Sequence, residues 1–432
     1  MICSLDRYIR NVSRLSSGER WLLMLVWIYF FHIFRNISLI AYVVVMGFVY
    51  IIAFAKNVKN ICGCKTHGLL ETIFILSYTL IMIITLFSGL SFEELFSSIS
   101  RFIIVYAIFV LFLSCRDRLS GRFVELAYYS YVIFIVLSAL SLFYQMFFGP
   151  IPFLAEASSR EGLIRYASLC GSLTAYGTMG PIGLILLIYK RELFTKIEYI
   201  LYSFIILGAM FISLQKAAMV NLALVIGWFV LSKLKKEKVF YKKFWITIIF
   251  AGIFILLVGV IFNPQLLFFK YITTAVNYVL FENHGSDVST DISPIADFYQ
   301  RLTSLPMRVY NFNNMSPSNF VFGIGLKAMS GTVGLDSYPQ CHNNFFEMIF
   351  TGGLLYLVSF IGLFFRAYKN SHKSSMVLMI IIFATANMLI GAFIISQPVL
   401  GVFLALLLIA DKNVSNDIHD CRLLSEKNNN IK

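Results

Sequence analysis

Long apolar runs alternate with short polar or basic stretches along most of this 432-residue chain. An α-helix needs about 20 apolar residues to cross the hydrocarbon core of a bilayer, and most of the runs approach that length. We therefore predict an all-α, polytopic membrane protein with about twelve transmembrane helices. The predicted spans are 21–34, 38–55, 70–90, 95–115, 123–148, 169–189, 197–214, 217–234, 244–262, 345–365, 375–395 and 398–410, of which the last is short.

One large hydrophilic loop separates spans nine and ten. It divides the chain into an N-terminal membrane bundle (1–262), the loop itself (263–344), the C-terminal spans (345–410) and a polar tail (411–432). Hydrophobic residues make up 59% of the chain and charged residues 13%, with a mean hydropathy of +0.80. This composition excludes a soluble domain of this length. The first run lacks a small-residue cleavage site, so we interpret it as a span rather than a cleaved signal peptide.

The distribution of charge predicts the orientation. With the N-terminus inside the cell, the predicted cytoplasmic stretches carry 26 Lys and Arg against 12 Asp and Glu, while the outer stretches carry 9 and 10. An excess of basic residues on the cytoplasmic side is the usual rule for membrane proteins. Both termini are therefore expected in the cytoplasm. The net charge of +13 then reflects topology and contact with anionic membrane lipid, and it does not indicate nucleic-acid binding.

Several cations fall on the predicted outer side. Arg160 and Arg165 precede a span that contains Pro181 and is rich in small residues. The small residues allow close approach of a neighbouring backbone or a ligand. Guanidinium groups suit phosphate because they stay charged and donate two hydrogen bonds in a fork. The alternative is that they reach lipid headgroups along the interface. Lys216, in a short turn between two apolar spans, and Arg101, in span four, leave the same two interpretations open.

The large loop combines a helical pattern with glycines. Residues 291–312 read as an amphipathic helix on the membrane surface, and this stretch includes Arg301. A turn at 316–319 leads into a short apolar run that ends at 323–326 with two glycines, among them Gly325. Glycine at such a place indicates close backbone approach or an unusual dihedral angle.

His342 closes the loop just before span ten. Asn344 with Glu347 three residues later resembles a capping box, which places a helix N-terminus there. The exposed N–H groups of a helix N-terminus favour an anion, and a histidine of near-neutral pKa can take a proton from a hydroxyl. A surface histidine that makes a turn hydrogen bond is the alternative.

Cysteine and carboxylate positions add two expectations. Cys170 and Cys341 both fall outside, and we favour two buried thiols over a disulfide between them. The first outer loop contains Arg35 but no acid, and Glu93–Glu94 is the only acid pair outside. A metal-dependent transferase would need carboxylates for its cation, so we expect neither a metal nor another cofactor.

The segment HNNFFEMIFTGGLLY (342–356) is similar to the histidine motif of the O-antigen ligase and O-antigen polymerase superfamily. The motif consists of His342, then Asn343, a nine-residue spacing to Gly353, and a Gly, Thr or Tyr position three residues on, here Tyr356. FGIGL (322–326) resembles the glycine-bearing element of the same family, and RYASLCGSLTAYG (165–177) its arginine segment. Twelve spans with one large periplasmic loop also match the family architecture.

The resemblance implies an inverting, metal-independent transferase that acts on undecaprenyl-diphosphate-linked glycans at the periplasmic face of the bacterial inner membrane. In this interpretation His342 activates the acceptor hydroxyl and Arg165, with Arg160, holds the diphosphate. The remaining candidates for substrate binding are Lys216, Arg301, Asn343 and Gly325. At Lys216 the family often has an arginine, and lysine keeps the charge but loses the fork.

Three functions follow from these observations. The first is an O-antigen polymerase, which transfers a growing lipid-linked chain onto the next repeat unit and could work with a chain-length regulator or a flippase. The second is an O-antigen ligase, which passes the polymer to lipid A–core. The third, from a different class, is a polysaccharide flippase or transporter. It would predict charges at mid-membrane depth and a repeated half, and the sequence has neither.

Overall fold

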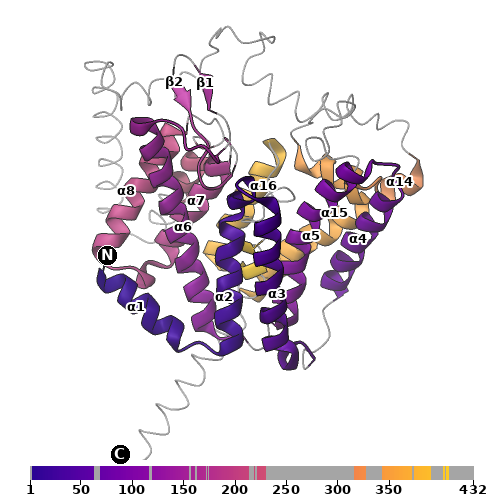
Figure 1. Ribbon diagram of the computed structural model, residues 1–432, viewed down its shortest axis with the longest axis horizontal. Coiled ribbons are helices and arrows are strands. Elements are labelled where there is room, and N and C mark those ends of the chain that lie inside the picture. The colour runs from indigo at the N-terminus through magenta and orange to yellow at the C-terminus, as the bar shows by residue number, and fades with distance from the viewer. Residues whose placement is uncertain are drawn as a thin grey trace, which may run out of the picture. The chain divides into compact units, whose positions relative to one another are not determined.

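The computed structural model describes the residues drawn in colour in Figure 1. They are 2–62, 69–115, 119–154, 157–160, 163–171, 173, 175–213, 218, 221–229, 316–326, 343–371, 374–390, 402–403 and 405–407. Most of these residues are helical. The predicted span at 244–262 and most of the large loop lie outside the described residues.

The chain divides into two compact units, Met1–Tyr131 with Phe298–Lys432, and Val132–Asp297. The first unit contains α1 (Ile2–Ser13), α2 (Ser17–Phe30), η1 (His32–Asn36), α3 (Leu39–Cys62), α4 (Leu69–Leu86), α5 (Phe92–Cys115), α14 (Pro317–Phe322), α15 (Asn344–Asn370) and α16 (Ser375–Ile390). The second contains β1 (Ser158–Arg160), β2 (Leu163–Arg165), α7 (Ala175–Tyr189), η3 (Arg191–Leu193) and α8 (Lys196–Ile212). Helix α6 (Gly121–Phe148) begins in the first unit and ends in the second.

Four described helices are long and apolar enough to cross a membrane, judged by length and composition. These candidate spans are Leu39–Val58, Leu69–Leu86, Gly121–Phe148 and Asn344–Lys369. Shorter apolar helices lie at Tyr106–Cys115, Ala175–Tyr189 and Ser375–Met388. Each of them coincides with a run from which a span was predicted.

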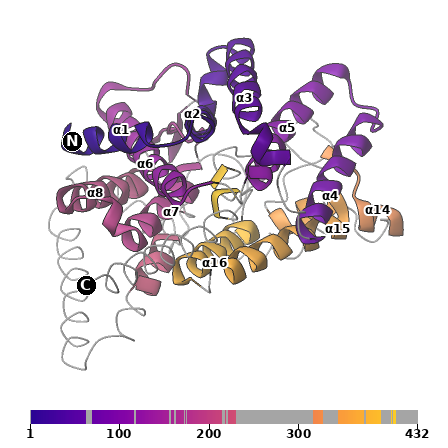
Figure 2. The ribbon, with the colours of Figure 1, turned by 90° about the horizontal axis from the view of Figure 1, so that it is seen from below.

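Helices α4 and α15 pack against each other as an antiparallel pair, with α14 beside them (Figure 2). Phe74 of α4 stacks on Tyr356 of α15, with ring centroids 5.6 Å apart. At one end of the pair, Arg366 Nε lies 3.4 Å from the buried Glu71 carboxylate. Aromatic packing along the pair, closed by this ion pair, holds α15 in a fixed register against α4.

Helix α2 begins at a capping box, four residues before the start of its apolar run. The Ser16 hydroxyl accepts from the Glu19 N–H, and the Glu19 carboxylate accepts from the Ser16 N–H. The other Glu19 oxygen accepts from both the hydroxyl (2.6 Å) and the N–H (2.8 Å) of Ser120, directly before α6. One buried carboxylate thus joins the starts of two helices. The predicted span 21–34 is wrong at its end, because α2 stops at Phe30 and η1 follows.

In the second unit, α7 contains Pro181 without losing a carbonyl partner. Proline has no N–H, so the carbonyl four residues earlier, that of Gly177, lacks its helical donor. The side-chain amide of Asn221 donates to this carbonyl at 3.0 Å. A neighbouring segment therefore replaces the missing hydrogen bond, which is how an apolar environment tolerates proline in a helix.

Helix α7 also begins six residues later than the predicted start of span six at 169. Side chains of α6 hold the backbone before it: Gln145 Nε2 donates to the Ala167 carbonyl at 2.8 Å, and Ser141 Oγ accepts from the Leu169 N–H at 3.3 Å. The sequence predicted helix from 169, but residues 169–171 form a turn in which the Gly171 N–H donates to the Ser168 carbonyl at 3.0 Å. Cys170 is a buried free thiol, as the sequence favoured, and its Sγ lies 3.4 Å from Ser138 Oγ.

Candidate functional site

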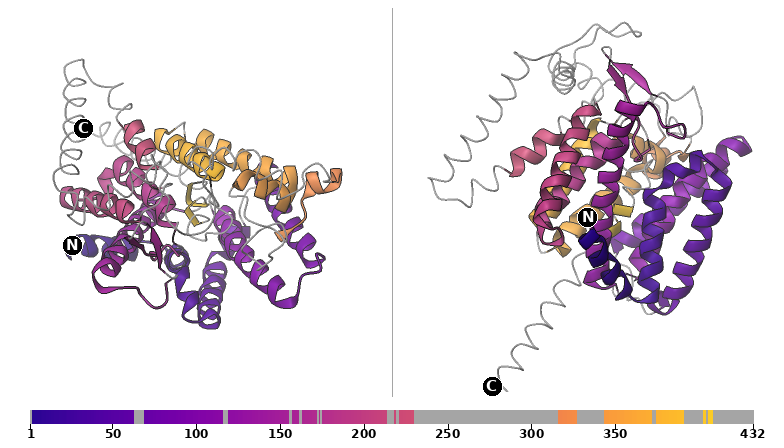
Figure 3. Two further views of the ribbon diagram at one scale, coloured as in Figure 1. Left: turned by 90° about the horizontal axis from the view of Figure 1, so that it is seen from above. Right: turned by 60° about the vertical axis from the view of Figure 1, so that its left-hand side comes forward.

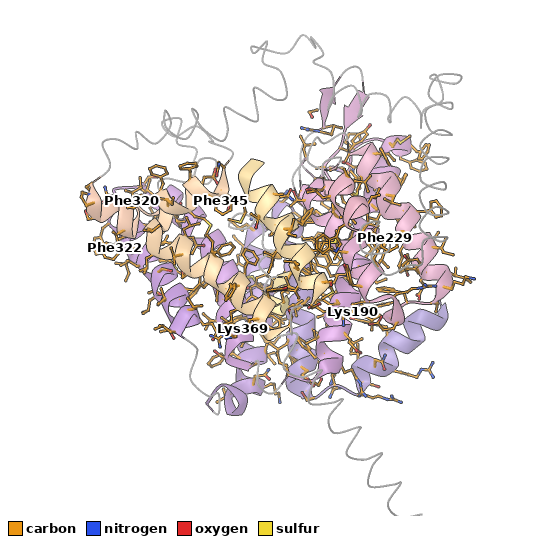
Figure 4. All side chains as sticks on the ribbon, turned by 180° about the vertical axis from the view of Figure 1, so that it is seen from behind. Lys190, Phe229, Phe320, Phe322, Phe345 and Lys369 are labelled. Carbon is orange, nitrogen blue, oxygen red and sulfur yellow. The ribbon has the colours of Figure 1, made fainter. Side chains whose placement is uncertain are left out.

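The central feature of the candidate site is a break in α15 at Gly353, where φ is 72° and ψ is −177°. At such a break the carbonyls of the preceding turn lose their helical donors. Here the Phe350 carbonyl accepts from the N–H of Ile324 at 2.7 Å, and the Thr351 carbonyl accepts from the N–H of Gly325 at 3.0 Å. The N–H groups of the segment after α14 thus replace the helical donors that these two α15 carbonyls lack. Phe320 and Phe322 of α14, and Phe345 and Lys369 toward the two ends of α15, are labelled in Figure 4.

The two backbones approach so closely that side chains are excluded. We call Gly323, Gly325 and Gly353, together with the backbone they contact, the glycine lock. A Cβ at Gly323 would overlap the Thr351 carbonyl, and one at Gly353 would overlap the carbonyl of Val321. All three glycines have φ between 72° and 79°, a region that residues with a side chain rarely adopt. Both the space and the dihedral angle therefore require glycine.

Thr85 connects a third segment, α4, to the glycine lock. Its hydroxyl accepts from the N–H of Leu326 at 2.8 Å and donates to the Ile81 carbonyl at 2.7 Å. A Cβ at Gly325 would lie 2.8 Å from the Thr85 hydroxyl. Sequence reasoning missed Thr85, because a threonine inside an apolar run has no distinguishing pattern.

Asn343 caps α15. Its Oδ1 accepts from the N–H groups of Phe345 (3.1 Å) and Phe346 (3.5 Å), and its backbone is extended. The predicted capping box of Asn344 with Glu347 is therefore wrong by one residue, since Asn344 is already helical. The Asn344 amide instead donates to the Glu347 carboxyl at 3.4 Å. Two of the sequence-predicted residues, Gly325 and Asn343, thus lie at the lock and at the start of the helix that it holds.

Arg165 lies in the second unit, on a two-stranded antiparallel ribbon seen in Figure 3. Ser158 of β1 is opposite Arg165 of β2, and Arg160 is opposite Leu163. The Arg165 side chain is buried, and its Nε donates to Ser158 Oγ at 3.2 Å. A plain connection was predicted here. The glycine at 162, between Ser158–Arg160 and Leu163–Arg165, was the available indication of a hairpin.

Most of the remaining candidate residues lie outside the part of the chain that the structure describes. His342, Lys216, Arg301 and Cys341 lie outside the described residues. Arg101 lies in α5. Within the described ranges, no group of three or more His, Cys, Asp or Glu side chains could hold a metal ion.

Each unit contains one feature that could take part in a reaction. The first unit has the capped start of α15, and the second has the buried guanidinium of Arg165. The helix start presents Asn343 directly after His342 in the chain. The ribbon presents Arg165 with one nitrogen held by a serine. No protein-family model matches the chain, and no curated protein matches it.

Proposed function

We propose that the chain is an O-antigen polymerase, which joins undecaprenyl-diphosphate-linked repeat units at the periplasmic face of the bacterial inner membrane. The observation that supports it best is the contact between two separate pieces of the family resemblance. FGIGL (322–326) and the histidine motif (342–356) are hydrogen-bonded to each other through Ile324–Phe350 and Gly325–Thr351. The glycines that carry the resemblance, Gly323, Gly325 and Gly353, also have no room for a side chain. The motif spacing therefore has a physical reason in this chain.

The proposed arrangement in the membrane has about twelve spans, with both termini in the cytoplasm. The α4–α15 pair supports the orientation. Its Glu71–Arg366 ion pair is at the end next to basic connections, and the contact of Thr85 with Leu326 is at the end next to the large loop. Under this orientation the first end faces the cytoplasm and the second faces the periplasm.

In the proposed reaction, the acceptor hydroxyl attacks the anomeric carbon of the donor glycan. The bond between that carbon and the diphosphate oxygen breaks, and undecaprenyl diphosphate leaves with the bonding electrons. His342 takes the proton of the hydroxyl, and Arg165 stabilises the charge that develops on the diphosphate. Attack from the face opposite the leaving group inverts the anomeric configuration. Arg160, Lys216 and Arg301 supply further positive charge near the lipid-linked substrate in this proposal.

The experiment is the lipopolysaccharide profile of a deletion strain. Core that carries a single repeat unit indicates a lost polymerase. Bare core, with lipid-linked polymer accumulating, indicates a lost ligase and overturns the proposal.

Complementation tests the residues. We expect His342→Ala and Arg165→Ala to leave the single-repeat profile, while His372→Ala, in a predicted cytoplasmic connection, restores long chains. Immunoblots of the membrane fraction control for the amount of each variant. Full-length chains from both the His342 and the Arg165 variant would remove the mechanism.

A further inference from the structure

One face of the N-terminal half of α15 is polar although it is buried. Asn344, Glu347 and Thr351 stand at positions i, i+3 and i+7, which share one side of a helix. Their exposed fractions are 1%, 5% and 0%. The half-helix that carries them starts at the Asn343 cap and ends at the Gly353 break. A polar, ionisable face inside a candidate span is costly in free energy and usually marks a functional site.

Thr351 of α15 differs from Thr79 and Thr85 of α4 in the hydrogen bonding of its hydroxyl. A threonine inside a helix commonly donates its hydroxyl to the carbonyl four residues earlier. Thr79 and Thr85 do so, to Ile75 at 2.9 Å and to Ile81 at 2.7 Å. The Thr351 hydroxyl is buried without a hydrogen-bond partner in the described part of the chain.

Asn344, at the other end of this half-helix, also has a buried polar atom without a hydrogen-bond partner among the described residues. Its Nδ2 donates to Glu347, but its Oδ1 is buried and, among the residues that the structure describes, has no hydrogen-bond partner. Buried polar atoms nearly always have a partner, and an exception calls for an explanation such as a missing ligand. Two such atoms on one face of one half-helix, with a carboxyl between them, indicate a shared cause.

We propose that the face formed by Asn344, Glu347 and Thr351 binds the hydroxyl groups of a glycan, specifically the acceptor sugar. This inference rests on the proposed function. Oδ1 of Asn344 and the Glu347 carboxyl accept hydrogen bonds from sugar hydroxyls, and the Thr351 hydroxyl both donates and accepts. The same oxygens disfavour an anion, so this face recognises the sugar and leaves the diphosphate to the arginines.

The stability of the unliganded protein separates a ligand site from a structural site. Removing an unsatisfied buried hydroxyl without changing its shape relieves a penalty, whereas removing a satisfied one loses a hydrogen bond. Thr351→Val should therefore raise the melting temperature of the purified full chain in detergent by about a few degrees. Thr79→Val, the matched control, should lower it, because the Thr79 hydroxyl contacts both Ile75 and Tyr106.

The binding measurement uses the free oligosaccharide repeat unit released by mild acid from the lipid-linked intermediate of the host. Its dissociation constant comes from the concentration dependence of the melting temperature. We expect roughly three- to tenfold weaker binding for Thr351→Val and about tenfold or more for Glu347→Gln, with Thr79→Val like wild type. Inorganic pyrophosphate should bind all these variants equally.

Three outcomes overturn the inference. They are a Thr351→Val variant that melts lower than wild type, unchanged oligosaccharide binding in both site variants, and a polymerising wild type that the oligosaccharide does not stabilise at millimolar concentration. The deletion strain judges the proposed function separately. Unchanged lipopolysaccharide in that strain, with oligosaccharide binding that still depends on Thr351 and Glu347, would reject the polymerase and keep the glycan site.

Discussion

The hydroxyl of Thr85 accepts a 2.8 Å hydrogen bond from the backbone N–H of Leu326, 241 positions further along the chain. This contact joins α4 to the segment after α14. The N–H groups of Ile324 and Gly325 in that segment donate to carbonyls of α15 just before its break. Three distant parts of the sequence thereby meet at the Gly353 break of α15. Because this break lies within the histidine motif (342–356), the geometry of the motif depends on residues that have no chemistry of their own.

Thr85→Val should destabilise the protein, and Thr85→Ser should not. Valine keeps the shape but leaves the buried Leu326 N–H without an acceptor, which costs about 1–3 kcal/mol. Serine retains the hydroxyl. Thermal unfolding of the purified protein in detergent measures the difference. Equal melting temperatures for valine and serine would mean that the hydrogen bond does not hold the segment.

Gly353→Ala should abolish accumulation of folded protein, since a Cβ there meets the Val321 carbonyl in addition to a φ of 72°. Two glycines separate these effects. Gly89 has a φ of 74° with nothing within 4 Å, so Gly89→Ala should cost only the dihedral strain, about 1–2 kcal/mol. Gly47, in α3, is likewise open, and Gly47→Ala should stabilise the helix by about 0.5–1 kcal/mol.

Fluorescence-detected gel filtration of the three alanine variants makes this comparison. The glycine lock requires that Gly353→Ala be much worse than Gly89→Ala. Similar yields of monodisperse protein from the two would argue against a close backbone contact at Gly353.

Asn221→Leu should cost about 1–3 kcal/mol, because it removes the amide that donates to the Gly177 carbonyl in an apolar surrounding. Pro181→Ala restores an N–H at the position that normally serves this carbonyl. The double variant should therefore recover most of the loss. Melting temperatures of the two single variants and the double variant give the coupling energy, and additive effects would contradict the proposed exchange of donors.

Glu19 should make stability depend on pH on the acid side. Burial raises the pKa of this carboxyl, but the hydrogen bonds from Ser120 and Ser16 together lower the pKa by more than burial raises it. The folded-state pKa is therefore below its ordinary value. The stabilisation is then complete above the unfolded-state pKa of about 4.3 and is lost as the pH falls through the folded-state value. Glu19→Gln should melt lower at neutral pH and show a smaller decline in melting temperature below about pH 5. Parallel acid profiles for the two proteins would contradict the assignment.

The long apolar runs located the starts of α3, α4, α6 and α15 to within two residues, because such a run has few alternatives to a buried helix. The predicted ends of α3 and α15 were seven and five residues too early. The apolar pattern failed where a single contact decided the backbone. Helix was predicted from 169 onward, but Gln145 and Ser141 of α6 hold the backbone there and residues 169–171 form a turn. Likewise the glycines of the two motifs were recognised individually, but nothing local indicated that Gly353 approaches Val321.

The candidate site shows the same division. Local pattern located the start of α15 to within one residue, while the partners of that helix could not be read from the chain around it. Thr85 illustrates why: its role depends on Leu326, and no sequence rule connects two positions so far apart. The unusual state of Thr351 is likewise visible only from the absence of its back-bond in the described structure.

The long sequence separation between Thr85 and Leu326 also sets an order of events during biosynthesis. Helix α4 leaves the ribosome early, yet the amide that its Thr85 accepts from is made more than two hundred residues later. Contacts between such distant positions close slowly and leave intermediates exposed. Nascent chains that stop before the Gly353 break therefore cannot complete this part of the fold, and premature truncation should make them substrates of membrane proteolysis.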